Sequence, residues 1–260
     1  MRLTRRRYPF INMQVQVVPF GILKESLGSD AFTVELADHS TMAELLAQLG
    51  SRSPAVDLRG IAVSVNAEYA NSNRILRDKD EVGLLPPVSG GSASQSADAS
   101  DEASPAHPEV ISLTRDPIDA EKLVVAAKKS EDGAVVVFDG IVRNNSRGRQ
   151  TLYLDYEAYE EMALKQMDEL AREARAKFGV RRVTIIHRLG RLHVGETSVL
   201  IVVASAHRAQ AYEASRWLID TLKKTVPIWK KETFVDGSVW ADGEPFPEGF
   251  AVEGLDAPSA

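Results

Sequence analysis

The sequence contains no cysteine among its 260 residues. This absence excludes disulfide bonds, thiolate metal ligands and any route that carries sulfur as a cysteine persulfide. The five histidines lack the HxxxH or HxH spacing of a metal site. The basic opening MRLTRRRYPFIN is not followed by an apolar run of signal-peptide length, and no stretch is long enough to span a membrane. Together these absences predict a cytoplasmic protein with no metal centre and no membrane segment.

Positive charge is also not in excess, because 31 basic residues stand against 37 acidic residues and the formal net charge is −6. The overall charge therefore gives no reason to expect a nucleic-acid partner. An anionic ligand would need a local pocket lined with basic side chains.

Residues 92–108 contain no aromatic and no large aliphatic side chain. Their Ser, Ala, Asp and Pro composition cannot bury enough apolar area to offset the entropy lost on ordering, so a flexible linker is predicted. The linker separates a first domain at 13–91 from a second domain at 109–250. The two remaining segments, at 1–12 and 251–260, are expected to be a disordered leader and a disordered tail.

The first domain, which begins at the candidate start Met13, has the alternating apolar residues of strands around one capped helix. Thr41 and Glu44 have the spacing of a capping box and predict the start of this helix, and Gly50 predicts its end. The other expected elements are a short helix at 21–26 and strands at 13–18, 31–36, 61–66 and 80–88. This pattern predicts a β-grasp, or ubiquitin-like, fold, followed by a pair of glycines of which Gly91 is the second.

The second domain mixes helices and strands and is predicted to be of the α+β class. Asp116 and Pro117 predict the start of its first helix, Gly179 the end of its second and Pro227 the end of its third. The strands are expected at 109–114, 133–143, 152–157, 181–190 and 196–206, the long helices at 158–179 and 207–227, and a hairpin at 228–240.

Basic side chains gather at the ends of elements in the second domain, where loops and termini build pockets. They form four clusters: Arg143, His207 with Arg208, Lys223 with Lys224, and Lys230 with Lys231 beside Glu232. Each cluster also has a structural explanation, since lysines in the last turn of a helix, for example, are stabilised by the helix dipole. Neighbouring residues on one strand point to opposite faces, so at most one of the lysines at 230 and 231 is expected to line a given pocket.

The order of these features resembles molybdopterin synthase. A β-grasp domain ends in SGG, and after the linker follow FDGIVRNNSRG, IIHRLGRLHVGE and ASAHRAQAYEASRWLIDTLKKTVPIWKKE. In that family a small ubiquitin-like sulfur carrier and a larger catalytic subunit are normally separate chains, whereas here both occur in one. The resemblance implies a C-terminal domain of the α/β-hammerhead type.

The resemblance also implies a sulfur transfer in molybdenum cofactor biosynthesis. The carrier bears a thiocarboxylate on its terminal glycine, and the large subunit converts cyclic pyranopterin monophosphate into molybdopterin by installing two dithiolene sulfurs. No permanently bound cofactor is expected. The family further implies a homodimer formed through the large-subunit domain, and an adenylating partner enzyme that thiolates the Gly-Gly tail.

Matched motif by motif, the resemblance implies two catalytic lysines and a substrate pocket. The catalytic positions are Lys223 and Lys230, with Gly91 as the sulfur carrier. The positions that match the substrate pocket are Ile141, Val142, Arg143, His207, Arg208, Lys231 and Glu232. Guanidinium groups suit a phosphate, and an ammonium group can stabilise negative charge that develops at a thiocarboxylate. Three roles stay open for Lys223: charge stabiliser, nucleophile and proton shuttle.

The fusion departs from the family pattern at one point, because Gly91 is joined to Ser92 by a peptide bond. An internal amide cannot be adenylated like a free carboxylate, so we expect a processing protease to cut after Gly91. Two other functions stay open. In one, the uncleaved β-grasp domain is a regulatory or interaction module on a pterin-binding domain. In the other, a generic anion-binding domain holds a different phosphate.

Overall fold

The structure, a computed structural model, describes residues 12–88, 110–146, 148–241 and 246. The predicted linker, Gly91, Ser92 and the predicted tail lie outside these residues, as does nearly all of the predicted leader. The chain divides into two compact units, each described here by itself. The first holds the described residues up to Pro86 together with Phe246, and the second holds those from Pro87 to Ala241.

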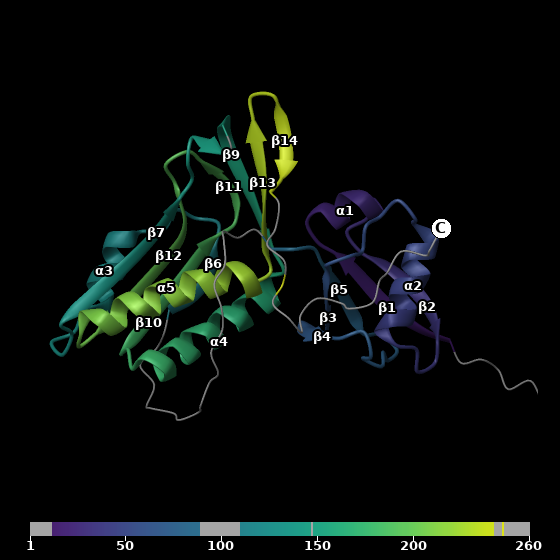
Figure 1. Ribbon diagram of the computed structural model, residues 1–260, viewed down its shortest axis with the longest axis horizontal. Coiled ribbons are helices and arrows are strands. Elements are labelled where there is room, and N and C mark those ends of the chain that lie inside the picture. The colour runs from purple at the N-terminus through teal and green to yellow at the C-terminus, as the bar shows by residue number, and fades with distance from the viewer. Residues whose placement is uncertain (1–11, 89–109, 147, 242–245, 247–260) are drawn as a thin grey trace, which may run out of the picture. The chain divides into compact units, whose positions relative to one another are not determined.

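The first unit is a five-stranded sheet with one long helix packed against it (Figure 1). The strand order is β2-β1-β5-β3-β4, in which β1 and β5 are parallel and the other pairs antiparallel. The bounds are β1 (Asn12–Pro19), α1 (Ile22–Leu27), β2 (Phe32–Ala37), α2 (Met42–Arg52), β3 (Ala62–Val65), β4 (Glu68–Ala70) and β5 (Glu81–Leu85). This arrangement confirms the predicted β-grasp fold.

Helix α2 shows how local sequence signals produce this unit. Its start is confirmed as a capping box, because the Thr41 backbone N–H donates to Glu44 Oε2 at 2.7 Å and the Thr41 hydroxyl accepts from the Glu44 N–H. The predicted end at Gly50 is wrong. The helix continues to Arg52, and the N–H of its cap residue Ser53 donates to the Leu49 carbonyl at 2.9 Å. Since glycine merely permits a left-handed cap, the backbone bond at Ser53 sets the end.

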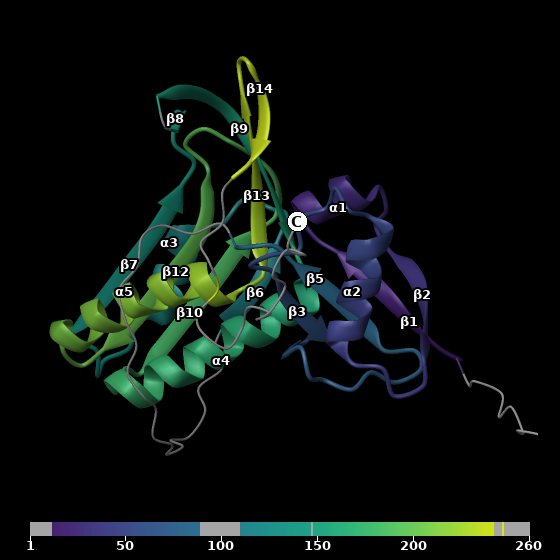
Figure 2. The same cartoon turned by 45° about the vertical axis from the view of Figure 1, so that its right-hand side comes forward.

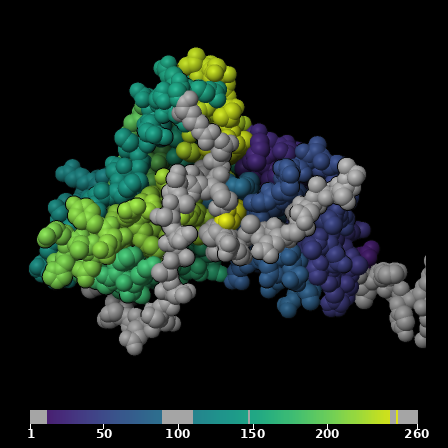
Figure 3. All heavy atoms as spheres, in the orientation of Figure 1, coloured from purple at the N-terminus to yellow at the C-terminus, as the bar shows by residue number. Residues whose placement is uncertain are grey.

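The second unit is built on a four-stranded sheet with helices on both faces. The strand order is β6-β10-β12-β7. The bounds are β6 (Val110–Thr114), α3 (Ala120–Ala127), β7 (Ala134–Ile141), α4 (Glu160–Phe178), β10 (Arg182–Arg188), β12 (Thr197–Ser205) and α5 (Arg208–Thr225). Helices α4 and α5 lie next to each other on one face of the sheet (Figures 2 and 3), and α3 packs on the other face (Figure 2). None of the described helices is long and apolar enough to cross a membrane.

Strand β12 explains why one apolar run occupies the middle of this sheet. Ile201 and Val203 join the core under α4 and α5, whereas Leu200 and Val202 join the core under α3. Successive side chains of a strand point to opposite faces, so a strand covered on both sides must be apolar throughout. The sequence TSVLIVVAS meets this demand.

A second sheet of this unit adjoins the four-stranded sheet, and the chain enters its strand β13 directly after α5. Its order is β11-β9-β13-β14, and a short strand β8 pairs with β9. The bounds are β8 (Asn145–Ser146), β9 (Arg149–Ala158), β11 (Gly190–His193), β13 (Ile228–Phe234) and β14 (Gly237–Trp240). The predicted hairpin is confirmed as β13 and β14, and Pro227 lies between α5 and β13 as expected.

Two local predictions for this unit are wrong. Asp119, not Asp116, caps α3, because its carboxylate accepts the Lys122 N–H at 3.0 Å. Ile118 packs against the apolar cluster under α3, so the helix begins only after it. The strand predicted as buried, β7, is an edge strand paired on one side with β12, and it leaves Val137 41% exposed.

Candidate active-site cavity

The second unit contains a cavity of about 420 Å³ where its two sheets meet the end of α5. Its lining comes from β7, β8, β9, β10, β12, β13 and the last turns of α5. The volume is within the range of small-molecule sites. Residues far apart in the sequence, such as Gly140, His187 and Lys230, therefore face the same space.

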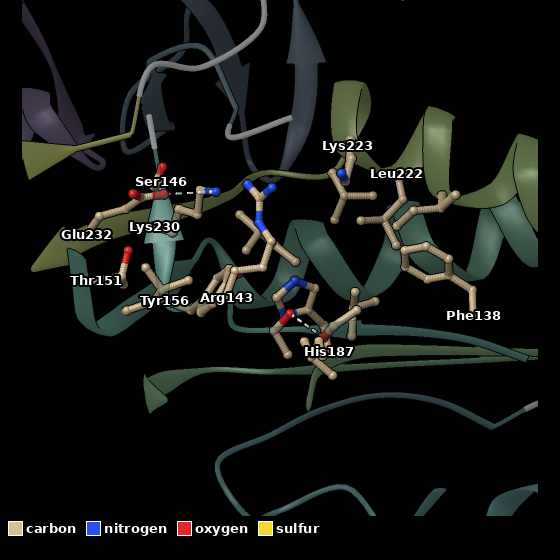
Figure 4. Close-up of a pocket in the computed structure, with 18 of the residues that line it drawn as sticks. Phe138, Arg143, Ser146, Thr151, Tyr156, His187, Leu222, Lys223, Lys230 and Glu232 are labelled. Carbon is tan, nitrogen blue, oxygen red and sulfur yellow. Dashed lines mark hydrogen bonds and ion pairs between the residues drawn. The ribbon is translucent and has the colours of Figure 1, made fainter. Parts of the chain in front are cut away.

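Three cationic side chains extend into this cavity from three directions. Arg143 follows β7, Lys223 lies in the last turn of α5, and Lys230 lies on β13. Figure 4 shows the Arg143 guanidinium between the two ammonium groups. Within the described residues, neither Arg143 nor Lys223 has an ion-pair partner, so both remain available to an anion. The arrangement can bind a phosphate or stabilise negative charge that develops in a reaction.

Helix α5 positions Lys223 through its buried stripe. Ala211, Ala214, Leu218 and Leu222 are all buried, and they hold the helix on the four-stranded sheet. Lys223 follows this stripe at the carboxyl end of the helix, where the macrodipole favours a cation. The helix ends at Thr225, and Ile228 begins the strand that returns to the cavity.

Strand β13 sorts its side chains by alternation. Ile228, Lys230 and Glu232 line the cavity. Lys230 Nζ lies 3.2 Å from Glu232 Oε1, and Glu232 is only 7% exposed. A buried carboxylate needs such a partner, so Lys230 both neutralises Glu232 and borders the cavity. Lys231 points the other way, with its ammonium 5.6 Å from the centroid of the Trp240 ring.

The floor of the cavity is polar but buried. Tyr156 and His187 pack edge to face, with ring centroids 5.1 Å apart. Burial raises the pKa of Tyr156, and burial lowers the pKa of His187 to about 4. The Ser198 hydroxyl donates to the Gly140 carbonyl at 2.8 Å. A Cβ at Gly140 would lie 2.6 Å from Val199 Cγ1, so only glycine allows this approach.

The structure brings some of the predicted site residues together and separates others. Those that line the cavity are Ile141, Arg143, Lys223, Lys230 and Glu232. Val142 is 2% exposed and packs with Leu154 and Leu192 instead. Lys231 points away, for the reason of strand alternation given above.

His207 and Arg208 lie elsewhere in the chain's structure. They line a separate shallow pocket at the first turn of α5, with Gly133 and Tyr212. Arg208 and Lys223 occupy opposite ends of that helix, about 22 Å apart at 1.5 Å per residue. One chain therefore does not bring them to the cavity of Lys223.

Sequence reasoning missed the floor residues Thr151, Tyr156, His187 and Ser198. A weak signal existed, because RVTIIHR places a histidine directly after two isoleucines of a strand. Among the described residues no group of His, Asp and Glu side chains could hold a metal ion.

Comparison with known proteins relates both units to described families. Residues 113–225 match the family model described as MoaE protein, and residues 17–91 match that of the ThiS family. Over 136 residues the chain is 40% identical to the molybdopterin synthase catalytic subunit of Pyrococcus abyssi. This alignment covers 52% of the chain described here and 92% of the Pyrococcus subunit. The corresponding subunit of Bacillus subtilis is 41% identical over 132 residues. That alignment covers 51% of the chain described here and 84% of the Bacillus subunit.

Among solved structures, molybdopterin synthase from Staphylococcus aureus is 40% identical and covers 52% of this chain and 98% of that one, with a TM-score of 0.49. Identity and coverage against the catalytic subunits decide the assignment. The chain belongs to the molybdopterin synthase catalytic subunit family, and it has a ThiS-family β-grasp domain ahead of the catalytic domain in the same polypeptide.

Proposed function

We propose that this chain is a molybdopterin synthase of molybdenum cofactor biosynthesis. It transfers sulfur from a glycine thiocarboxylate to cyclic pyranopterin monophosphate and so forms the dithiolene of molybdopterin. The observation that supports this most is the cavity of the catalytic unit, where Arg143, Lys223 and Lys230 converge in a chain whose net charge is −6. Such a local concentration of positive charge suits an anionic substrate and an anionic sulfur donor.

The three cations divide the work by their chemistry. Arg143 has a planar guanidinium that can bind the substrate phosphate in a bidentate manner. Lys223 stabilises the negative charge that develops as the thiocarboxylate sulfur attacks a substrate carbon. Lys230, held by Glu232 at 3.2 Å, completes the positive wall at a fixed position.

The β-grasp domain supplies the sulfur in this proposal. Its family match ends at residue 91, the second glycine of the pair. Glycines can thread a narrow channel because they have no Cβ. A protease cuts between Gly91 and Ser92, and an adenylating partner enzyme then converts the new carboxylate into a thiocarboxylate.

The cut is testable by mass spectrometry of the protein taken from cells that make the cofactor. A fragment ending at Gly91 is expected. Gly91→Ala should abolish product formation, whereas Ser94→Ala, just beyond the proposed cut, should not. Cofactor synthesis by a chain that stays full length, in cells without a separate carrier, would contradict the proposal and favour the uncleaved interaction module.

We further propose that the enzyme is a homodimer in which His207 and Arg208 reach the cavity of the other copy. The family resemblance assigns these residues to the same substrate as Lys223, yet they lie at the opposite end of α5. A second copy is the simplest way to unite the two sets.

Mixed dimers of Lys223→Ala and Arg208→Ala chains test this arrangement. If the residues act across the dimer, one site of each mixed dimer has no lesion, and random mixing restores about a quarter of wild-type activity. If they act within one chain, every site has a lesion and mixing restores nothing. The second result would leave the sulfur transfer intact but overturn the shared site.

A further inference from the structure

The cavity of the catalytic unit has two chemically different ends. Its mouth presents the cations Arg143, Lys223 and Lys230, while its floor presents Thr151, Tyr156 and His187 (Figure 4). The mouth suits the phosphate and the thiocarboxylate. Thr151 and His187 are buried and Tyr156 is half-buried, and none of these three side chains is charged, so they suit a different part of a ligand.

The hydrogen bonds of His187 show which atom faces a ligand. His187 Nδ1 lies 3.0 Å from the Arg188 carbonyl oxygen, which can only accept. Nδ1 therefore has the proton, and Nε2 has a free lone pair. The low pKa of this ring, caused by burial, agrees with a neutral imidazole. His187 is 4% exposed, and no described side chain donates to its second nitrogen.

The neighbouring hydroxyl groups can accept a hydrogen bond as well. The Ser198 hydroxyl gives its single proton to the Gly140 carbonyl, so it does not occupy a lone pair of the Tyr156 oxygen. The Tyr156 oxygen then has lone pairs left to accept with. Thr151 is 4% exposed, lines the cavity, and its Oγ1 has no hydrogen-bond partner among the described residues. A buried polar atom without a partner lowers stability, and a bound ligand that pairs with it would remove that cost.

We propose that this floor binds the N–H edge of the pyranopterin ring, with His187 Nε2 accepting a hydrogen bond from a ring N–H or amino group. Tyr156 and Thr151 flank that contact. The inference rests on the proposed function and names the part of the substrate that each end of the cavity recognises. At the floor a phosphate would meet the lone pair of His187 Nε2, which cannot donate to it, whereas a pterin ring is rich in N–H donors. The substrate is thus oriented with its ring inward and its phosphate toward Arg143.

Two substitutions at His187 separate binding from a purely structural role. Asn can reproduce the Nδ1 donor to Arg188 but has no atom at the Nε2 position. Gln can place an oxygen near Nε2 but does not reproduce the Nδ1 bond. If His187 binds the ring, His187→Gln is the better tolerated change; if it only supports the fold, His187→Asn is.

The measurement is the affinity of the full-length chain for cyclic pyranopterin monophosphate without sulfur donor, by calorimetric titration, alongside inorganic phosphate. His187→Asn should weaken pyranopterin binding about tenfold or more, and His187→Gln only a few-fold. Phosphate binding should be unchanged in both, whereas Arg143→Ala should weaken both ligands. Unfolding midpoints of all variants are measured in parallel.

The outcomes distinguish the two proposals. If the wild-type chain binds phosphate but not the pyranopterin, the proposed function fails and the inference with it. If wild-type and His187→Asn bind the pyranopterin equally, or Asn is better tolerated than Gln, only the inference is overturned. Tyr156→Phe, which keeps the ring but removes the hydroxyl, decides the matter if the His187 variants do not fold. It should weaken the pyranopterin and leave phosphate unchanged, and equal affinities would overturn the inference.

Discussion

The β-grasp unit and the catalytic unit differ in what surrounds their buried polar groups. In the first, the buried carboxylate of Asp80 is satisfied within the fold, accepting from Asn66 Nδ2 and from the Arg77 N–H, each at 2.9 Å. In the second, Thr151 and His187 are buried with polar atoms that face a cavity instead. Buried polar atoms without a partner occur in both units, Ser64 Oγ among them in the first, but those of Thr151 and His187 face a cavity that a ligand can fill. On the proposed function, the folded part of the first unit supports its glycine end, and the chemistry takes place in the second.

The largest expected effect tests whether the first unit is only a support. Leu46 is fully buried under the sheet. Leu46→Ala should lower the free energy of unfolding of the β-grasp unit by about 2–5 kcal/mol, because it leaves a cavity. Pyranopterin binding by the catalytic unit should be unchanged. Calorimetric unfolding and ligand titration measure the two quantities, with the exposed Arg52→Ala as the near-neutral control. Equal losses in stability and binding would contradict the division of labour.

The second prediction concerns the catalytic unit, where a substitution should lower the rate of sulfur transfer and leave the stability of the fold unchanged. Lys223→Ala should lower the rate of sulfur transfer by about 10²–10³, the usual cost of losing one charge-stabilising group. Lys224→Ala is the matched control, since it removes a neighbouring lysine that does not line the cavity. Single-turnover assays with a thiocarboxylated carrier give the rates. A loss as severe in Lys224→Ala would show that the net charge of the helix end matters, not the cavity.

A smaller effect concerns the ion pair that holds α3 in the catalytic unit. Arg181 Nη2 donates to Asp132 Oδ2 and to the Ala127 carbonyl, each at 2.6 Å. This side-chain bond lowers the pKa of Asp132 below its ordinary value of about 3.9. The pair therefore stabilises the fold above about pH 4, and the contribution is lost as pH falls through the lower folded-state pKa. Asp132→Asn should destabilise most at pH 7, with the difference shrinking toward pH 3.

Urea unfolding at pH 7, 5 and 3 measures this difference, with Asp116→Asn at an exposed site as control. A constant difference between wild type and Asp132→Asn across that range would mean that the pair does not titrate as described.

The smallest expected effect is local to the β-grasp unit. Thr41→Ala removes the side-chain acceptor of the capping box and should cost about 1 kcal/mol of unfolding free energy. Thr41→Ser keeps the hydroxyl and should restore most of it. The denaturant midpoint for unfolding of the β-grasp unit measures both changes. An unchanged midpoint in Thr41→Ala would show that neighbouring hydrogen bonds hold the helix start without the cap.

Local sequence signals predicted most elements but not every boundary. The alternation of β1 and the helix expected at 207–227, observed as α5, appear where the pattern placed them, because the core requires their apolar residues to be buried. Asp116 and Gly50 failed because another residue offered a competing cap, Asp119 in one case and Ser53 in the other. Tertiary contacts, together with the capping residues, therefore determine at which residue each helix begins or ends.

The candidate site divides in the same way. Arg143, Lys223 and Lys230 could be predicted because each is a basic residue at the end of an element, and they do line one cavity. Tyr156 and His187 could not, since each lies within a strand and the sequence does not show which side chain of another strand it meets. They become a site only because β9 and β10 place the two rings 5.1 Å apart.

By itself the sequence determined the two-domain order, the β-grasp fold, the glycine pair and the identities of the basic residues, because periodicity, capping and composition act between near neighbours. Only the tertiary structure decided that Arg143, Lys223 and Lys230 face one cavity, that Lys231 turns away, and that His207 and Arg208 lie at the far end of α5. The reason is physical: which side chains meet across sheets and helices depends on strand pairing and packing between residues far apart in the chain, and no local pattern encodes those distances.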